Sequence, residues 1–364
     1  MNNIEARFKR IAVKVGSNVV TQSDGSLNIG RMLRIVEDIA VLHKQGVDII
    51  LITSGAVAAG RGDVVPLKRT DEVSSKQMWA AIGQVKLMSN YQFIFGKYNI
   101  LAGQVLAVKE SFSDRRHYLN IRNCIDALLD NRVIPVVNEN DTVSVSELMF
   151  TDNDELSGMI SSMMGCGSLI ILSNVDGIFT GVPSDENSEL IREVSPESDN
   201  IEQYIAPVTS GFGRGGMLTK YSIARKLASE GTHVYIANGT RNSIVTDIVR
   251  GKNVPFTHFV AADVEKDNVR KWLSHSEAFA KGAVYVNNGA RDALKGEKAS
   301  SLLLIGVEKI DGFFKKGDII RILDSNGEQV GIGKSQYDSE KAEKLIGAKR
   351  KKPLIYYNYM HIDE

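Results

Sequence analysis

The sequence predicts an α/β fold in which a mainly parallel central sheet is flanked by helices, followed by a small mostly-β barrel. Between residues 10 and 260, short β-branched runs alternate with helical stretches, which is typical of a parallel sheet. These runs are apolar throughout instead of alternating with polar residues, as expected of strands buried on both faces. After residue 261 the pattern changes to short alternating strands separated by glycine-containing turns, which indicates a separate β domain.

The first part of the chain is predicted to contain strands and helices in turn. Its strands are expected at residues 11–15, 48–53, 101–108, 133–137, 169–172 and 233–236. Its helices are expected at residues 29–43, 75–95, 114–131, 154–164, 219–229 and 242–250. The first helix keeps its apolar residues on one face, with Asn28 as its N-cap and Gly46 just past its end.

The change of pattern sets the expected domain boundaries. We expect one domain at residues 1–262, a charged connector at 263–280 and the β domain at 281–364. Strands of the β domain are predicted at residues 283–286, 302–307, 318–323 and 329–332. Turns between them are predicted at Asn288-Gly289, Lys316-Gly317 and Asn326-Gly327.

Composition and charge exclude several classes of protein. The 364 residues include 44 Lys and Arg and 44 Asp and Glu, so no overall field attracts nucleic acid or an anionic membrane. The two cysteines, Cys124 and Cys166, lie far apart and indicate neither a disulfide scaffold nor a zinc site. No apolar stretch approaches the roughly 20 residues that span a bilayer. No secretory signal is visible, so a cytoplasmic protein without a membrane partner is expected.

Small and polar residues follow the predicted strands. In open parallel sheets, ligands bind outside the carboxyl ends of the strands. At these positions the sequence has Gly16-Ser17-Asn18, Ser54-Gly55-Ala56, Asn138–Asp141 and Ser173–Asp176. We therefore expect these four loops to form one binding site.

Lys14 lies inside the first predicted strand, between apolar neighbours. A buried lysine costs free energy unless it has a partner, and a bound phosphate is a natural partner near the end of a strand. The alternative is a lysine on an edge strand, which would extend its charged end into solvent.

A glycine-rich stretch, Gly211–Gly216, runs directly into Met217-Leu218-Thr219-Lys220. Glycines allow backbone N–H groups to approach phosphate oxygens, and the start of a helix adds partial positive charge. The stretch matches G-x-G-x-x-G, but no strand precedes it and no acidic residue follows the next strand, which argues against a nicotinamide site. Met217 stands where a P-loop has its lysine. The alternative is a surface loop without a ligand.

Acidic and amide side chains gather in two clusters, Asn138–Asp141 and Asp152-Asn153-Asp154. Such clusters suit a metal ion, an ammonium group or the orientation of lysines. The alternative is ordinary turn chemistry, in which Asn and Asp bond to their own backbone.

Together these residues resemble the amino-acid kinase family, and within it the members that phosphorylate glutamate. The matching motifs are Val13–Ser17, Ile52–Arg61, Ser75-Lys76-Gln77, Asn138–Asp141, Asp152–Asp154 and Gly215–Lys220. The C-terminal barrel is similar to a PUA domain, which many bacterial members carry.

The resemblance implies an enzyme that uses ATP and Mg²⁺ to phosphorylate the side-chain carboxylate of L-glutamate, giving L-glutamyl 5-phosphate, the first step of proline synthesis. It implies that Ser54, Asp141 and Asn153 bind glutamate. It implies that ATP is bound by Lys14, Ser173, Asn174, Arg214, Gly215, Gly216, Met217, Leu218, Thr219 and Lys220. Lys14 and Lys220 would stabilise the transferring phosphoryl group, and Asp154 would hold the two lysines; no metal ligand is assigned.

The resemblance also has departures and open alternatives. Asn174 stands where the family often has Asp, and Leu218 where a small polar residue is common. The family usually assembles as a dimer or tetramer through its N-terminal domain, and proline inhibition is a family property. Acetylglutamate, aspartate and carbamate are alternative substrates. RNA is an alternative partner of the barrel, although residues 281–364 contain 15 Lys and Arg against 12 Asp and Glu, which disfavours it.

Overall fold

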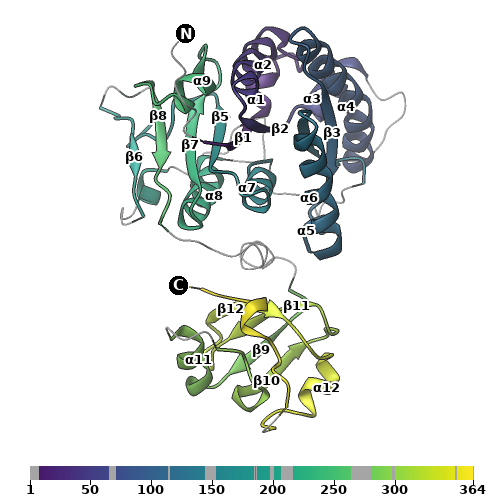
Figure 1. Ribbon diagram of the computed structural model, residues 1–364, viewed down its shortest axis with the longest axis vertical. Helices are drawn as coiled ribbons and strands as arrows, with labels where there is room; N and C mark the ends of the chain where they lie inside the picture. The colour runs from purple at the N-terminus through teal and green to yellow at the C-terminus, as the bar shows by residue number, and fades with distance from the viewer. Residues whose placement is uncertain are drawn as a thin grey trace. The chain divides into compact units, whose positions relative to one another are not determined.

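The computed structural model describes residues 8–64, 71–113, 115–143, 153–183, 185, 187–196, 201–205, 216–263, 280–296, 300–348 and 351–363. The chain divides into two compact units, one made of Met1–Ser111 and Arg116–Glu265, the other of Phe112–Arg115 and Lys266–Glu364 (Figure 1). Most of the connector predicted at 263–280 lies outside the described residues. Each unit is described below by itself.

The first unit is built on an eight-stranded sheet with the order β3-β4-β2-β1-β5-β7-β8-β6. Its strands are β1 Arg10–Val15, β2 Asp48–Thr53, β3 Ala102–Ala107, β4 Ile134–Glu139, β5 Ser168–Ser173, β6 Glu193–Val194, β7 His233–Asn238 and β8 Phe256–Phe259. All neighbouring strands run parallel except β7 and β8, which pair antiparallel. The mainly parallel sheet predicted from the apolar runs is therefore confirmed.

Helices cover both faces of this sheet (Figure 1). They are α1 Ser17–Val20, α2 Ile29–Lys44, α3 Ala56–Asp63, α4 Glu72–Gly96, α5 Glu110–Ser113, α6 Arg115–Asp130, α7 Asn153–Met163, α8 Met217–Ser229 and α9 Ile244–Val249. Helix α2 packs against α4 and α9, while α7 and α8 pack together and against β1, β5 and β7. In the part of the chain that the structure describes, no helix has the length and apolar character needed to span a membrane.

Local signals place α2 as predicted. The Asn28 side chain accepts a hydrogen bond from the Arg31 backbone N–H at 3.1 Å, and Gly46 has a φ of +93° just past the helix. On the apolar face of α2, Met32 and Ile39 are fully buried in the core, whereas Ile29 at the start of the helix is 43% exposed. Periodicity and capping were thus sufficient to define this element.

Helices α3 and α4 cross at backbone contact, and two glycines make this possible. A Cβ atom added to Gly83 of α4 would lie 1.8 Å from the carbonyl oxygen of Ala56, and one added to Gly60 of α3 would lie 1.9 Å from that of Trp79. Any side chain at either position would force the helices apart. The crossing therefore places the segment of α4 around Gly83 directly beside the start of α3.

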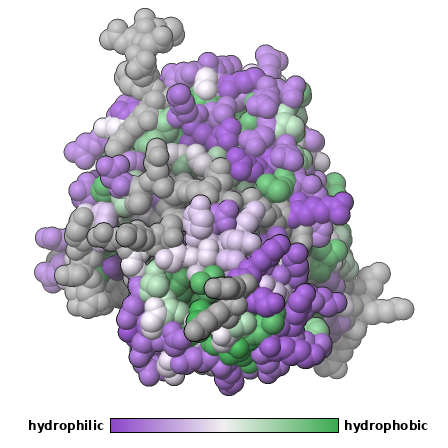
Figure 2. Space-filling model, turned by 60° about the horizontal axis from the view of Figure 1, so that its bottom comes forward, coloured by the Kyte–Doolittle hydropathy of each residue, from purple (hydrophilic) through white to green (hydrophobic). Residues whose placement is uncertain are grey.

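The second unit has a five-stranded sheet with the order β10-β9-β11-β12-β13. Its strands are β9 Gly282–Val286, β10 Val307–Gly312, β11 Ile319–Leu323, β12 Gln329–Lys334 and β13 Met360–Ile362. Strands β9 and β11 are parallel and the other pairs antiparallel. Figure 2 shows apolar side chains gathered on one face of this unit. Among its described residues, the large apolar side chains that are exposed are Leu303, Ile305, Phe313 and Tyr357.

Two local predictions for this unit are wrong. Asn288-Gly289 is not a turn, because Asn287 accepts a hydrogen bond from the Ala290 backbone N–H at 2.8 Å and caps helix α11, Asn288–Lys295. The strand expected at 302–307 is replaced by a single bridge at Leu302 and a 3-10 turn, and pairing begins only at Val307. The turns at Gly317 and Gly327 are confirmed, with φ values of +102° and +86°.

Candidate active site

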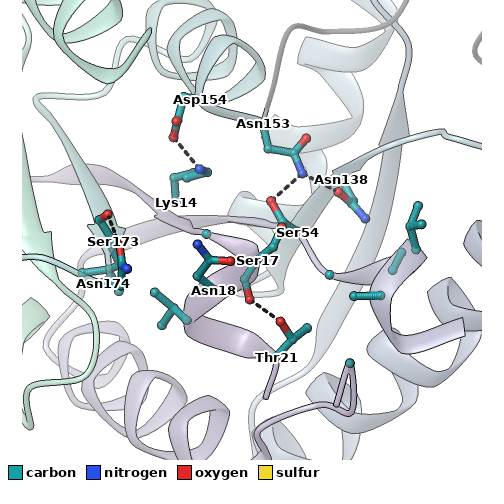
Figure 3. A pocket seen from close by; sticks show the side chains of 18 of the residues that line it. Lys14, Ser17, Asn18, Thr21, Ser54, Asn138, Asn153, Asp154, Ser173 and Asn174 are labelled. Carbon is teal, nitrogen blue, oxygen red and sulfur yellow. Dashed lines mark hydrogen bonds and ion pairs between the residues drawn. The ribbon is translucent and has the colours of Figure 1, made fainter. Parts of the chain in front are cut away.

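The carboxyl ends of β1, β2, β4 and β5 meet at one cleft of about 750 Å³ (Figure 3). Strand β1 lies near the centre of the sheet, with β2 on one side and β5 on the other. Open parallel sheets bind their ligands at such a point, where the strand order changes direction. The four loops predicted to form one site all contribute to its walls. The residues that line it include Lys14, Gly16, Ser17, Asn18, Ser54, Gly55, Arg61, Lys76, Asn138, Glu139, Asp141, Asn153, Asp154, Ser173, Asn174, Gly216, Met217 and Lys220.

Lys14 projects into this cleft from the middle of the sheet. Strand β1 pairs with β2 on one side and β5 on the other, so the edge-strand interpretation of Lys14 is wrong. The residue is only 4% exposed. A lysine held so far from water needs a negative partner within the protein or in a ligand.

Asp154, in the first turn of α7, is that partner for two lysines. One carboxylate oxygen forms an ion pair with Lys14, and the other accepts a hydrogen bond from the Lys220 ammonium group at 2.8 Å. Burial would raise the pKa of Asp154, but the charges of Lys14 and Lys220 and their hydrogen bonds outweigh it and lower the pKa to about 2. Two cations share one carboxylate, so the cluster has a net positive charge in a buried place, which suits a phosphate group.

The start of α8 brings Lys220 to the cleft. Gly216 is the N-cap of this helix, and Met217 and Lys220, three residues apart, share the face that lines the cleft. Leu218 is 49% exposed, and neither Leu218 nor Thr219 lines the cleft. Arg214 and Gly215 lie outside the described residues. The helix start also directs backbone N–H groups outward, as a phosphate site requires.

Ser173 and Asn174 line the cleft on the β5 side of Lys14, and the Ser173 hydroxyl donates to the Asn174 side-chain oxygen at 3.3 Å (Figure 3). The loop that follows is held by Arg241, which donates two hydrogen bonds to Asp176, each 2.7 Å long. The Arg241 hydrogen bonds hold the pKa of Asp176 below its usual value, although burial opposes them. The sequence offered no signal for this pair, which joins loops after two different strands.

On the β2 side, neutral side chains form a connected network (Figure 3). The Asn153 amide nitrogen shares its two protons among three acceptors, the Ser54 hydroxyl at 2.7 Å, the Thr53 carbonyl at 3.0 Å and the Asn138 side-chain oxygen at 3.0 Å. Ser54 precedes Gly55, the N-cap of α3, where the chain turns into the helix. Gly55 has a φ of +102°, which only glycine adopts readily. The resemblance implied Ser54 and Asn153 as glutamate ligands, whereas Asn138 was predicted at the site only as a member of the polar cluster Asn138–Asp141.

Acidic residues complete the predicted set. Asp141 lines the cleft in the turn after β4, while Asp152 lies outside the described residues. Within the described part of the chain, no three His, Cys, Asp or Glu side chains form a group that could hold a metal ion. Both oxygens of Asp154 face lysines. These residues fit a divalent ion that is held mainly by phosphate oxygens of a bound nucleotide.

Comparison with known proteins agrees with this arrangement. The model of the amino acid kinase family matches residues 9–238. The chain belongs to the amino acid kinase family. The model of the PUA domain matches residues 282–355, within the second unit. The amino acid kinase match covers every strand that brings a residue to the cleft.

Relatives of this amino acid kinase match over its whole length. A protein of Bacteroides thetaiotaomicron named glutamate 5-kinase is 51% identical over 361 residues, covering 99% of this chain and 100% of the relative. A glutamate 5-kinase of Chlorobaculum tepidum is 45% identical and covers 98% of both chains. Among solved structures, the isopentenyl phosphate kinase of T. acidophilum has a TM-score of 0.50 at 15% identity, covering 69% of this chain and 99% of that one. That likeness concerns the fold alone.

Proposed function

We propose that this amino acid kinase transfers the terminal phosphoryl group of ATP to the side-chain carboxylate of L-glutamate, forming L-glutamyl 5-phosphate for proline biosynthesis. The observation that carries the proposal is a single cleft with two unlike sides. One side has the buried Lys14–Asp154–Lys220 cluster, and the other has the neutral network of Ser54, Asn138 and Asn153. The choice of L-glutamate as the substrate is supported by the full-length relatives named glutamate 5-kinase.

The chemistry requires no general base from the protein. The nucleophile is a carboxylate with a reference pKa of about 4.3, which is already ionised at neutral pH. In keeping with this, no histidine lines the cleft in the part of the chain that the structure describes. The protein has to hold two anions in line and compensate the charge on the transferring phosphoryl oxygens. Lys14 and Lys220 perform the second task, and Asp154 holds both ammonium groups in place.

The remaining residues divide between the two substrates. Ser54 orients a glutamate carboxylate by a hydrogen bond, Asn153 contributes to glutamate binding by holding the Ser54 hydroxyl in place, and the negative Asp141 receives the ammonium group. Ser173, Asn174 and the loop Arg214–Lys220 receive the nucleotide, with the α8 N–H groups directed to its phosphates. The supporting observation is that all of these residues within the described ranges line the cleft, except Leu218 and Thr219.

Magnesium is expected to arrive with ATP. When bound to the phosphates it neutralises part of their charge and aligns the terminal group. The cleft carboxylate Glu139 lies outside the lysine cluster and would provide an oxygen ligand to such an ion. Lys14 and Lys220 would compensate the remaining negative charge on the transferring phosphoryl group.

A substrate panel tests this function. Purified protein is supplied with ATP, Mg²⁺ and, in separate reactions, L-glutamate, acetylglutamate or aspartate, and ATP consumption is measured. We expect consumption that depends on L-glutamate. Consumption that depends only on acetylglutamate or aspartate would contradict the proposed substrate while retaining the phosphoryl-transfer site.

We further propose that the protein is a cytoplasmic homo-oligomer, dimer or tetramer, and that proline inhibits it near the glutamate site. The observation that supports assembly is on α4, where Ile82, Val85 and Phe93 share one helical face and the last two are 68% and 66% exposed. Leu101, just before edge strand β3, is 73% exposed. Light scattering should show the oligomer for the natural chain and smaller particles for Phe93→Asp. An unchanged mass would contradict this surface.

A further inference from the structure

Gln84 lies on α4, outside the cleft, yet it is bonded to the network that lines it. It is 9% exposed and does not belong to the cleft lining. Its side-chain oxygen accepts a hydrogen bond from the Asn138 amide nitrogen at 2.8 Å. Gln84 follows Gly83, so the backbone contact between α3 and α4 determines where it sits.

Two backbone groups determine which way every amide in this network faces. The Glu139 backbone N–H donates to the Asn138 side-chain oxygen at 2.9 Å, and the Thr53 carbonyl accepts from the Asn153 amide nitrogen. Turning either amide around would place two acceptors or two donors against each other. Asn138 must therefore direct its amide nitrogen toward Gln84, and the Gln84 side-chain oxygen must accept the hydrogen bond.

The same order extends to Ser54. The Ser54 oxygen accepts from Asn153, so its own hydroxyl proton is left for donation into the cleft. A hydroxyl donor is what a substrate carboxylate oxygen requires. The chain of bonds from Gln84 through Asn138 and Asn153 thus ends in a donor of defined direction at the surface of the cleft.

Stability alone does not account for a glutamine here. Among the described residues, the Gln84 amide nitrogen is buried without a hydrogen-bond partner. Burial of an unpaired donor costs roughly 1–3 kcal/mol, and an apolar side chain of similar length would only move that cost from the Gln84 nitrogen to the buried Asn138 amide nitrogen. The oxygen of Gln84 is the part of the side chain that the network uses.

We propose that Gln84 is a positioning residue that orients the Asn138 amide and, through Asn153, the Ser54 hydroxyl, and so determines affinity for the carboxylate substrate. The inference rests on the proposed function only for the identity of that substrate. The proposal predicts that a change at Gln84 alters KM for glutamate but not KM for ATP, because the network contacts the β2 side of the cleft and not the lysine cluster.

The test compares Gln84→Met, which keeps the length of the side chain but removes the acceptor, with Gln84→Glu, which keeps an acceptor oxygen. Loss of one neutral hydrogen bond corresponds to a change of about five- to tenfold. We expect Gln84→Met to raise KM for glutamate by about that factor, with KM for ATP and kcat within about twofold of the natural values. Gln84→Glu should restore KM to within about threefold. Gln92→Met, at an exposed position of α4, is the matched control.

Equal changes in KM for both substrates, or a Gln84→Glu variant as impaired as Gln84→Met, would overturn the proposal. A crystal structure of Gln84→Met provides a readout that does not depend on turnover. It should show a turned Asn138 amide and a lost Asn153–Ser54 hydrogen bond. Unchanged amides would overturn the positioning role, whereas inactivity of the natural protein toward glutamate would contradict only the proposed function.

Discussion

At the end of the central strand β1, Lys14, Asp154 and Lys220 carry full charges and are nearly excluded from water, with side-chain exposures of 5%, 1% and 11%. On the β2 side, Ser54, Asn138 and Asn153 carry none and are joined by neutral hydrogen bonds. The charged side compensates negative charge on a transferring group, where electrostatic stabilisation is the main contribution to catalysis. The neutral side provides direction through hydrogen bonds.

The largest effect should come from removing the shared counter-charge. Asp154→Asn leaves two buried lysines without an anion, and breaking a buried ion pair in this way costs about 3–5 kcal/mol. Because the folded-state pKa of Asp154 is lowered to about 2, its stabilisation is fully present above its unfolded pKa of 3.8. We expect the natural protein to exceed the variant in free energy of unfolding at pH 7, and the difference to shrink as the pH falls from about 4 toward 2.

Urea denaturation of both proteins over that pH range measures the difference. Equal stability at neutral pH would contradict a structural role for the carboxylate. Asp176→Asn, which alters a more exposed ion pair with Arg241, is the comparison and should cost less.

The next largest effect should fall on turnover. Lys220→Ala removes a cation that meets the phosphoryl group, and we expect kcat to fall by about 100-fold or more, the loss typical of a removed transition-state contact. Steady-state kinetics and circular dichroism, with Lys226→Ala on the same helix as control, measure rate and folding together. Natural turnover in a folded Lys220→Ala protein would remove Lys220 from the catalytic set.

On the neutral side the effect should be smaller and should appear in KM. Ser54→Ala removes one hydroxyl donor, and we expect KM for glutamate to rise by about tenfold, with KM for ATP nearly unchanged. Initial-rate measurements with each substrate varied in turn separate the two constants. A fall in kcat of the size expected for Lys220→Ala would show that the two sides do not divide their tasks in this way.

The smallest effect concerns Asp38, a buried carboxylate whose hydrogen-bond donors are neutral groups. It accepts hydrogen bonds from the Val245 backbone N–H and the Thr246 hydroxyl, but burial dominates and raises its pKa to about 6. The folded state therefore binds the proton more tightly than the unfolded state. We expect the stability of the natural protein relative to Asp38→Asn to rise by about 1 kcal/mol between pH 7 and pH 5. Thermal unfolding at both pH values checks this, and the opposite sign would contradict the raised pKa.

Most of the charged side could be predicted from local sequence. Lys14 stood out as a lysine in an apolar strand, and Lys220 as a lysine at the start of a helix after glycines. The contact of both with Asp154 depends on the sheet order, which local patterns do not specify. Gln84 gave no signal at all, because its partner Asn138 lies 54 residues away and the helix around it is apolar on several faces.

Competition between local signals explains the errors in the second unit. Asn288-Gly289 matched a hairpin turn, but the side chain of the preceding Asn287 caps a helix and decided the outcome. Leu302 forms an isolated antiparallel bridge with Ile355, a residue distant in the sequence, and the segment does not form the expected strand. Turn signals were reliable where a glycine with positive φ had no competing cap, as at Gly317 and Gly327.

The most direct test of the central claim is trapping of the acyl phosphate. The natural protein is incubated with ATP, Mg²⁺, L-glutamate and hydroxylamine, and glutamyl hydroxamate is measured beside ADP, with Lys220→Ala in parallel. The account predicts one hydroxamate for each ADP formed by the natural protein, and about 100-fold less of both from the variant. Glutamate-dependent ADP formation without hydroxamate would contradict a carboxylate acceptor and with it the assignment of the two sides of the cleft.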